Sequence, residues 1–298
     1  MGYKLRPKDP AAEVRKVARQ GIDKAIEALS VPSAERAEGV HQARKRFKEL
    51  RALLRLVRKP LGSEFKRENR RLRDLGRALA ESRDATAMLE SWDLLAARFP
   101  GLFAEADFKQ ARQRLQARAR HGEDETADLD DRLARVIAEL RAASACIDDW
   151  PLKGAGFELL AAGVQRTYAD GCADLAKVRH EPSDELLHEW RKRVKDHWYQ
   201  TRLLAPSWPK LMQLRSDSLK QLADLLGDDH DLAMMQQLMQ AQASLFGDRA
   251  LHERLGQAIV ERRGELQRAA LKLGDELYLE SPQDLVARWQ RYWDAAAD

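Results

Sequence analysis

The sequence repeats itself at one fixed spacing. The segment HQARKRFK, which begins at His41, matches HEWRKRVK, which begins 147 positions later at His188. The spacing holds without a gap into the following segment, where Asp84 aligns with Asp231. Two unrelated helical segments can share leucine positions by chance. They do not readily share a histidine, five basic residues and an aspartate at one fixed spacing. We therefore predict an internal duplication, with a boundary near residues 147–153.

Apolar residues recur at three- and four-residue spacing along nearly the whole chain, and no convincing period-2 run is bounded by turns. This pattern predicts an all-α protein. The expected helices span residues 10–29, 34–58, 63–97, 107–121, 126–146, 156–178, 183–204, 209–243, 249–279 and 282–296. Ser183, which is followed by two acids, is expected to cap the helix that it begins.

Charge is unevenly distributed along the chain. The net charge is only +4, yet the stretch from Arg44 to Arg73 holds thirteen Lys/Arg residues against three Glu. The two cysteines, Cys146 and Cys172, lack CxxC spacing, and no apolar run reaches the roughly 18 residues of a membrane span. We therefore expect a cytoplasmic protein with no membrane partner, in which local charge determines what is bound.

The segment that begins at His41 predicts a helix with two distinct faces. At 100° per residue, its basic side chains fall within an arc of about 120°, opposite an apolar face. The apolar face consists of Ala43, Phe47, Leu50, Leu54 and Val57. The basic stripe consists of His41, Arg44, Lys45, Lys48, Arg51 and Arg55, and its copy of His188, Arg191, Lys192, Lys195 and Arg202. Arg46 and Arg193 point away from the stripe, and Trp198 replaces Arg51 in the second copy.

A cation on every helical turn suits a linear ligand that repeats its negative charge. Arginine grips phosphate through two parallel hydrogen bonds, and lysine acts as a compact point charge. A histidine at the head of the helix adds a donor whose charge can change near neutral pH. In the next segment, Arg73 and Lys220 occupy equivalent positions and extend the predicted site. Asp84 and Asp231 lie about three turns further along the same face and are expected to orient cations by ion pairing.

Other interpretations remain open at this stage. The stripes could be solvated helix faces, a nucleic-acid surface, or the docking face of a helical adaptor for an acidic protein. The acidic run from Glu123 to Asp131 disfavours a long duplex. A metal-dependent phosphohydrolase would need a metal held by His41, His188 and carboxylates. The chain lacks the phosphate-loop, HExxH and GxSxG motifs, so we predict neither catalysis nor a cofactor or metal.

The two copies resemble the CHAD family (conserved histidine α-helical domain). The similarity rests on HQARKRFKELRALLRL and HEWRKRVKDHWYQTRLL, each followed by a leucine-rich segment that ends in ESRDATAM or GDDHDLAMM. The family glycine of the second segment is Gly227 in the second copy and Ala80 in the first. The resemblance spans essentially the whole chain and implies one domain over residues 1–298, with halves at 9–147 and 153–298.

The resemblance also implies a fold and a ligand. The resemblance implies two helical bundles related by a pseudo-twofold axis. Their basic helices would face a central groove or pore that binds inorganic polyphosphate. A stand-alone polyphosphate binder, associated with polyphosphate granules, is therefore expected. The ligand residues carried over are His41, Arg44, Lys45, Lys48, Arg55, Arg73, His188, Arg191, Lys192, Lys195, Arg202 and Lys220. Arg51 has no basic counterpart, and it joins the predicted ligand residues through its place on the stripe.

Overall fold

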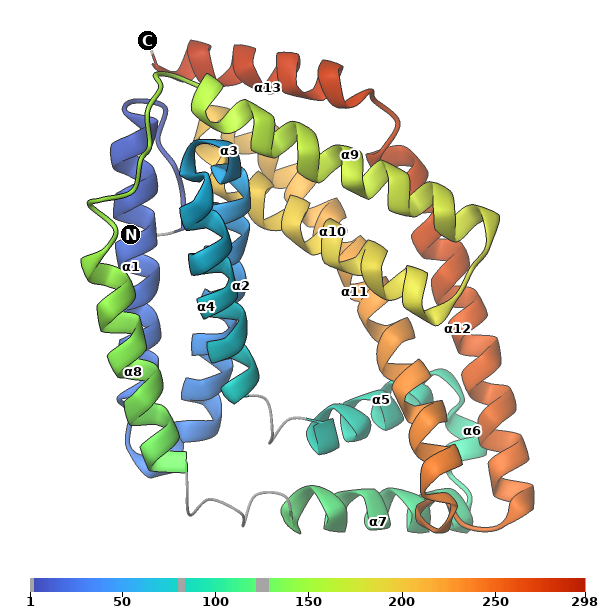
Figure 1. Ribbon diagram of the computed structural model, residues 1–298. Coiled ribbons are helices and arrows are strands. Elements are labelled where there is room, and N and C mark those ends of the chain that lie inside the picture. The colour runs from blue at the N-terminus through green and yellow to red at the C-terminus, as the bar shows by residue number, and fades with distance from the viewer. Residues whose placement is uncertain (1–2, 80–83, 122–128, 298) are drawn as a thin grey trace.

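The computed structural model describes residues 3–79, 84–121 and 129–297, and within these ranges every regular element is helical (Figure 1). The expected all-α class is thus confirmed. The α-helices are α1 (Pro10–Leu29), α2 (Arg36–Leu56), α3 (Arg58–Leu61), α4 (Ser63–Ala78), α5 (Asp84–Arg98), α6 (Pro100–Phe103), α7 (Ala106–His121), α8 (Leu129–Ala145), α9 (Glu158–His180), α10 (Asp184–Leu203), α11 (Pro209–Ala241), α12 (Arg249–Leu277) and α13 (Pro282–Ala297). Short 3₁₀ turns lie at Ser33–Glu35, Ala205–Ser207 and Ala243–Leu245.

Local sequence signals fix where several helices begin. The expected cap of α10 is confirmed, because the Leu186 backbone N–H donates to Ser183 Oγ at 3.2 Å. Asp9 accepts from the Ala12 N–H in the same way at the start of α1. Proline, which has no N–H to lose, occupies the first position of α1, α11 and α13. These caps satisfy N–H groups that have no partner inside their own helix.

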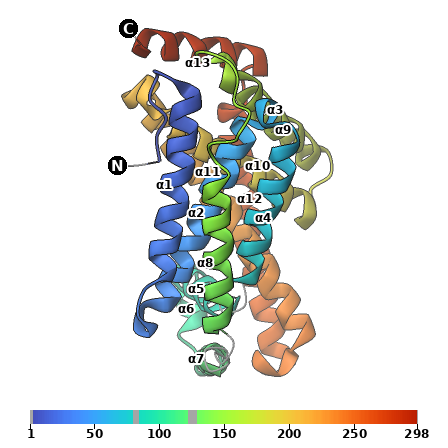
Figure 2. The ribbon, with the colours of Figure 1, turned by 60° about the vertical axis from the view of Figure 1, so that its left-hand side comes forward.

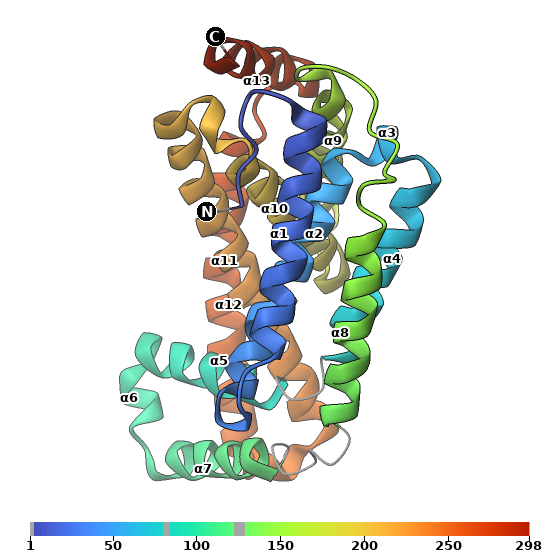
Figure 3. The same ribbon diagram turned by 90° about the vertical axis from the view of Figure 1, so that its left-hand side faces the viewer.

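The two halves of the chain build the same sequence of helix pairs. α1 packs along α2 in the first half, and α9 packs along α10 in the second. α8 then returns to pack on α1, just as α13 returns to pack on α9. Figures 2 and 3 show α1, α2, α4 and α8 side by side, with α13 at the opposite end of the molecule from α7. The order of helices therefore follows the 147-residue repeat of the sequence.

One expected helix, over residues 63–97, is wrong. α4 ends at Ala78, and a separate helix, α5, begins at Asp84 and runs in another direction (Figure 1). In the second copy the equivalent stretch is the single 33-residue helix α11. α5 packs against α7, α11 and α12 and buries Trp92 and Leu95 there. Burial of these side chains favours the change of direction over helix continuity, which periodicity alone does not reveal.

The apolar side chains form two cores, and each contains residues of both halves. The main core includes Phe47 and Leu54 of α2 together with Trp190 of α10. The distal core lies at the α5–α7 end of the molecule and combines Met88 of α5 with its repeat counterpart Met235 of α11. The sequence boundary near residues 147–153 is therefore not a boundary in packing.

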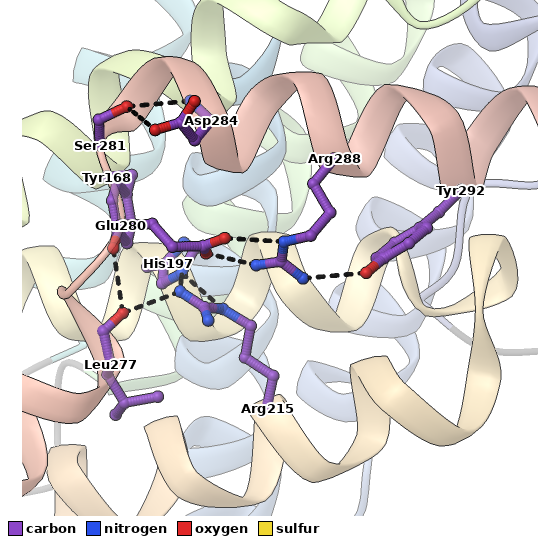
Figure 4. A network of polar contacts seen from close by, with 9 residues as sticks. All are labelled: Tyr168, His197, Arg215, Leu277, Glu280, Ser281, Asp284, Arg288 and Tyr292. Atoms are coloured by element: carbon purple, nitrogen blue, oxygen red, sulfur yellow. Dashed lines mark hydrogen bonds and ion pairs between the residues drawn. The ribbon is translucent and has the colours of Figure 1, made fainter.

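A buried polar network joins α9, α10, α11 and the end of α12 next to α13 (Figure 4). His197 of α10 is fully buried and stacks on Trp289 of α13, with ring centroids 5.6 Å apart. Its Nε2 accepts a hydrogen bond from Arg215 Nε at 3.3 Å, and Arg215 Nη2 also donates to the Leu277 carbonyl at 3.0 Å. Burial and the charge of Arg215 hold the pKa of His197 well below its ordinary value, so the ring is neutral and accepts.

Candidate polyanion-binding site

The two-faced character predicted for α2 is confirmed. Every residue of the predicted apolar face is at most 3% exposed, and the face packs into the main core. On the opposite side Lys48 is exposed, and His41, Arg44, Lys45, Arg51 and Arg55 are half-buried. We call these six residues the α2 stripe. The helix thus buries one face and presents cations on the other.

α10 repeats this arrangement in the second half. Leu187, Trp190 and Val194 are buried in the main core. The α10 stripe consists of His188, Arg191, Lys192, Lys195 and Arg202, of which Lys192 is exposed and the others are half-buried. Because α2 packs directly along α10, the two stripes belong to neighbouring helices although they are far apart in sequence.

The pKa of Lys195 on the α10 stripe is affected by a cation of the α2 stripe. Burial lowers the pKa of Lys195 to about 7, and the positive charges of Arg191 and Lys48 act in the same direction. Lys48 is the repeat counterpart of Lys195 and comes from the other half of the chain. Asp231 and Asp224 of α11 oppose this effect without cancelling it. The structure therefore brings like charges from both halves together, which is unfavourable unless an anion is bound.

Two buried carboxylates connect the halves reciprocally. Arg202 Nη1 lies 3.1 Å from Glu49 Oε1, and its repeat counterpart Arg55 lies with Nε 3.2 Å from Asp196 Oδ2. Glu49 and Asp196 are themselves repeat counterparts and are 2% and 8% exposed. Each carboxylate thus receives an arginine from the opposite half. Arg55 and Arg202, predicted as ligand residues, have partners at the contact between α2 and α10.

Arg46 and Arg193, which sequence analysis placed off the stripes, complete this set. Arg46 donates to Glu49 Oε2 at 2.7 Å, and Arg193 Nη1 lies 3.5 Å from Asp196 Oδ2. Glu49 and Asp196 therefore each bind one arginine of their own helix and one of the other half. The helical spacing of the cations does not single out these two acids. Their shared position in the repeat was the signal that could have found them.

The replacement of Arg51 by Trp198 preserves one contact while removing a charge. Arg51 Nε donates to Asn69 Oδ1 of α4 at 3.1 Å. Trp198 Nε1 donates to Ser216 Oγ of α11 at the same distance, and Asn69 and Ser216 are repeat counterparts. Burial lowers the pKa of Arg51 to about 10, with Arg55, Arg73 and Arg77 as nearby cations. Both side chains hold the stripe helix to the next helix, but only Arg51 adds positive charge.

The head of the α10 stripe contains a pair of stacked histidines. The rings of His188 and His230 of α11 lie 4.6 Å apart at 28°. Burial lowers the pKa of His188 to about 4, and the charges of His230, Lys192 and Arg191 contribute. His188 is therefore uncharged at neutral pH. His230 was not among the predicted site residues, although it precedes Asp231 in the repeated segment.

Asp231 of α11 lies beside His230, and the charges of Arg191 and Lys195 act on its carboxylate. Its carboxylate is 3.0 Å from His230 Nδ1. Burial raises its pKa, but the hydrogen bond from His230 and the charges of Arg191 and Lys195 outweigh burial and lower the pKa overall. A Cβ at Gly227 would lie 3.4 Å from Arg191 Nη2, so this glycine leaves room for the guanidinium against α11. Ala80 and the side chain of Asp84, their counterparts, lie outside the described residues.

A family model for the CHAD domain matches residues 11–240 of the chain. The match covers more than half of the 298 residues and includes both stripes. The chain belongs to the CHAD family. No curated protein matches it. α12 and α13 lie beyond the matched residues, yet both contribute to the main core of this CHAD chain.

Three predicted ligand cations of the CHAD site already have acidic neighbours on their own helices. Lys192 lies 2.5 Å from Glu189, Lys220 lies 2.5 Å from Asp224, and Arg73 Nε lies 2.9 Å from Asp74. All these cations are at least 41% exposed in their side chains. Exposed pairs of this kind contribute little stability, so an incoming polyanion can replace the carboxylate at small cost.

Among the described residues, no three His, Cys, Asp or Glu side chains lie close enough together to hold a metal ion. None of the described helices of this CHAD chain is both long and apolar enough to cross a membrane. The side chains of the two stripes supply positive charge and hydrogen-bond donors, which are the groups that bind phosphate.

Proposed function

We propose that this CHAD domain binds inorganic polyphosphate along the α2 and α10 stripes, without turning it over. The observation that carries the proposal is the approach of Lys48 and Lys195, equivalent cations from the two halves, at the contact between α2 and α10. Concentrated like charge has an energetic cost in the free protein, and a polyanion removes that cost. A central basic groove or pore, and a pseudo-twofold relation between the halves, belong to this proposal.

Affinity would arise from many weak charge interactions acting together. Each cation that meets a phosphate releases a counterion and forms a charge-assisted hydrogen bond. Such binding reads charge spacing and carries no sequence information. Binding of this kind also weakens steeply as the salt concentration rises. For a ligand that behaves as single-stranded nucleic acids do, a ten-fold increase in salt lowers the logarithm of the affinity by about 0.7 for each phosphate contact.

Reversal of four stripe charges tests the proposal. The variant with Lys45, Lys48, Lys192 and Lys195 changed to glutamate should lose binding of long-chain polyphosphate in an anisotropy assay at fixed ionic strength. The matched control changes four exposed lysines outside the stripes, Lys109, Lys153, Lys210 and Lys272, to glutamate and has the same net charge. Circular dichroism verifies that both variants are folded. Wild-type affinity in the stripe variant would contradict the proposal.

RNA is the principal alternative ligand, because it also presents a chain of phosphates. We propose that polyphosphate is preferred, because its charges are more closely spaced. Of the acidic run that disfavours a long duplex, residues 123–128 lie outside the described residues. Competition at matched phosphate concentration decides between the ligands. Displacement of labelled polyphosphate by RNA at equal or lower concentration would favour a nucleic-acid-binding protein.

Binding without catalysis is a separate part of the proposal. Incubation of the chain with polyphosphate and Mg²⁺ or Mn²⁺ should release no orthophosphate above the level of the stripe variant. Phosphate release that depends on His41 and His188 would instead indicate a phosphohydrolase.

We further propose a cytoplasmic location at polyphosphate granules. Co-localisation of the labelled protein with granules, and its loss in the stripe variant, would test this location.

A further inference from the structure

The two copies of the site differ strongly in charge. α2 carries seven Lys/Arg residues against two acids, whereas α10 carries five against four. The difference continues in the following segment, where α4 carries six Lys/Arg against three acids and the equivalent residues 210–225 of α11 carry three against two. Positive charge is therefore concentrated in the first half, although the two halves share their helix order.

The excess on α4 forms a second stripe. Lys66, Arg70, Arg73 and Arg77 are spaced by four, three and four residues, so they share one face of α4. We call these residues the α4 stripe. Three of them are exposed and Arg73 is half-buried. Their repeat counterparts on α11 are Gln213, Asp217, Lys220 and Asp224. Two arginines of the first copy thus correspond to aspartates in the second.

The α4 stripe lies on the side of α4 that faces α2. The hydrogen bond from Arg51 to Asn69 joins the two helices there, and the charges of Arg73 and Arg77 act on Arg51. The opposite side of α4 faces α8, where Arg71 Nε lies 3.5 Å from Glu139. The α2 and α4 stripes therefore approach each other at Arg51, Arg73 and Arg77.

The equivalent surface of the second half neutralises itself. Lys192 pairs with Glu189 and Lys220 with Asp224, while Gln213 donates to Asp217 Oδ1 at 2.8 Å. In the first half, Glu189 and Asp224 are replaced by Gln42 and Arg77. Glu189 and Asp224 thus have no acidic counterpart in the first half, where Asp74 is the acid beside Arg73 and Arg77.

We propose that the polyanion is held mainly by the first half, along the α2 and α4 stripes, and that Arg70 and Arg77 contact it directly. The second half contributes through Lys195 and Arg191, where it meets α2, and its outer surface on α11 repels the ligand. This inference rests on the proposed function. It adds two contacts outside the repeated basic motif and an asymmetry that the duplication alone does not predict.

Exchange of charges between the copies tests this asymmetry. Arg70→Gln with Arg77→Gln should weaken binding of long-chain polyphosphate at least ten-fold and reduce the salt slope by about 1.4, or about 0.7 for each lost cation. Asp217→Arg with Asp224→Arg on α11 should strengthen binding several-fold. The matched control, Lys109→Gln with Arg141→Gln, removes two exposed first-half charges outside the stripes and should change affinity less than two-fold.

The outcomes separate this inference from the proposed function. If the wild-type chain binds polyphosphate and the four-lysine stripe variant does not, the proposed function stands. An Arg70/Arg77 variant that then keeps wild-type affinity and salt slope would overturn the asymmetry. Equal weakening by Arg70→Gln/Arg77→Gln and by the control pair would also overturn it, because net charge alone would explain the loss. If the wild-type chain binds no polyphosphate, both proposals fail together.

Discussion

Lys195 illustrates how packing changes what a single residue can do. A lysine on the surface of a helix stays charged at neutral pH, but here burial, Arg191 and Lys48 lower the pKa of the amine to about 7. The sequence predicts that Lys195 lies in the stripe, because helical spacing is a local property. It cannot predict the altered pKa, since that depends on how α10 packs against α2 from a segment 147 residues away.

Polyphosphate binding should therefore depend on pH. A bound polyanion favours the charged amine, so the pKa of Lys195 is higher in the complex than its value of about 7 in the free protein. Affinity should rise as the pH falls from about 9 to about 7, by up to ten-fold for each pH unit, and then level off until His188 begins to titrate. Binding isotherms at constant ionic strength across this range measure the effect.

The control for this prediction is Lys195→Met, which keeps an apolar stem of similar length without the amine. It should bind more weakly at pH 7 and should lack the rise between pH 9 and 7. The charged groups around Lys195, namely Arg191, Lys48, Asp224 and Asp231, remain in this variant. An unchanged pH profile in Lys195→Met would assign the titration to another group.

At the scale of the element, helix spacing and helix ends were predictable, but the direction of the chain after α4 was not. Leucine periodicity continues through residues 63–97, and in the second copy the equivalent residues do form one helix, α11. The first copy differs because α5 buries Trp92 in the distal core with α11 and α12. This contact forms only when the two halves pack together, so the local sequence pattern does not predict it.

Gly163 of α9 marks a close approach between helices of the two halves. A Cβ at this position would lie 1.9 Å from the Leu56 carbonyl oxygen at the end of α2, and backbone cannot move aside cheaply. Gly163→Ala should therefore destabilise the fold by about 2–3 kcal/mol, as overpacking does. Urea denaturation measures the loss. Gly256→Ala on α12, where a Cβ meets nothing within 4 Å, is the matched control and should be neutral or stabilising.

At the scale of the whole molecule, the contact between α2 and α10 serves both stability and function. The carboxylates of Glu49 and Asp196 bind Arg202 and Arg55 across it, and Lys48 approaches Lys195 beside these pairs. The repeat predicted which helices are equivalent. It did not predict that acids within those helices would bind arginines of the opposite half, because this depends on how α2 packs against α10.

Loss of the crossing arginines should affect stability more than binding. Arg55→Met with Arg202→Met leaves Glu49 and Asp196 with only Arg46 and Arg193, so the free energy of unfolding should fall by about 2–4 kcal/mol. Polyphosphate affinity, measured at a temperature where the variant is folded, should fall less than ten-fold. A large loss of affinity with unchanged stability would show that these arginines act as ligand contacts instead.

The most direct test of polyphosphate binding along the stripes is a crystal structure of the chain grown with polyphosphate. Phosphate density should lie between α2 and α10 beside Lys48 and Lys195, and should continue along α4 past Arg73 and Arg77. Phosphates bound only elsewhere on the molecule, with no anion at Lys48 and Lys195, would contradict this binding site.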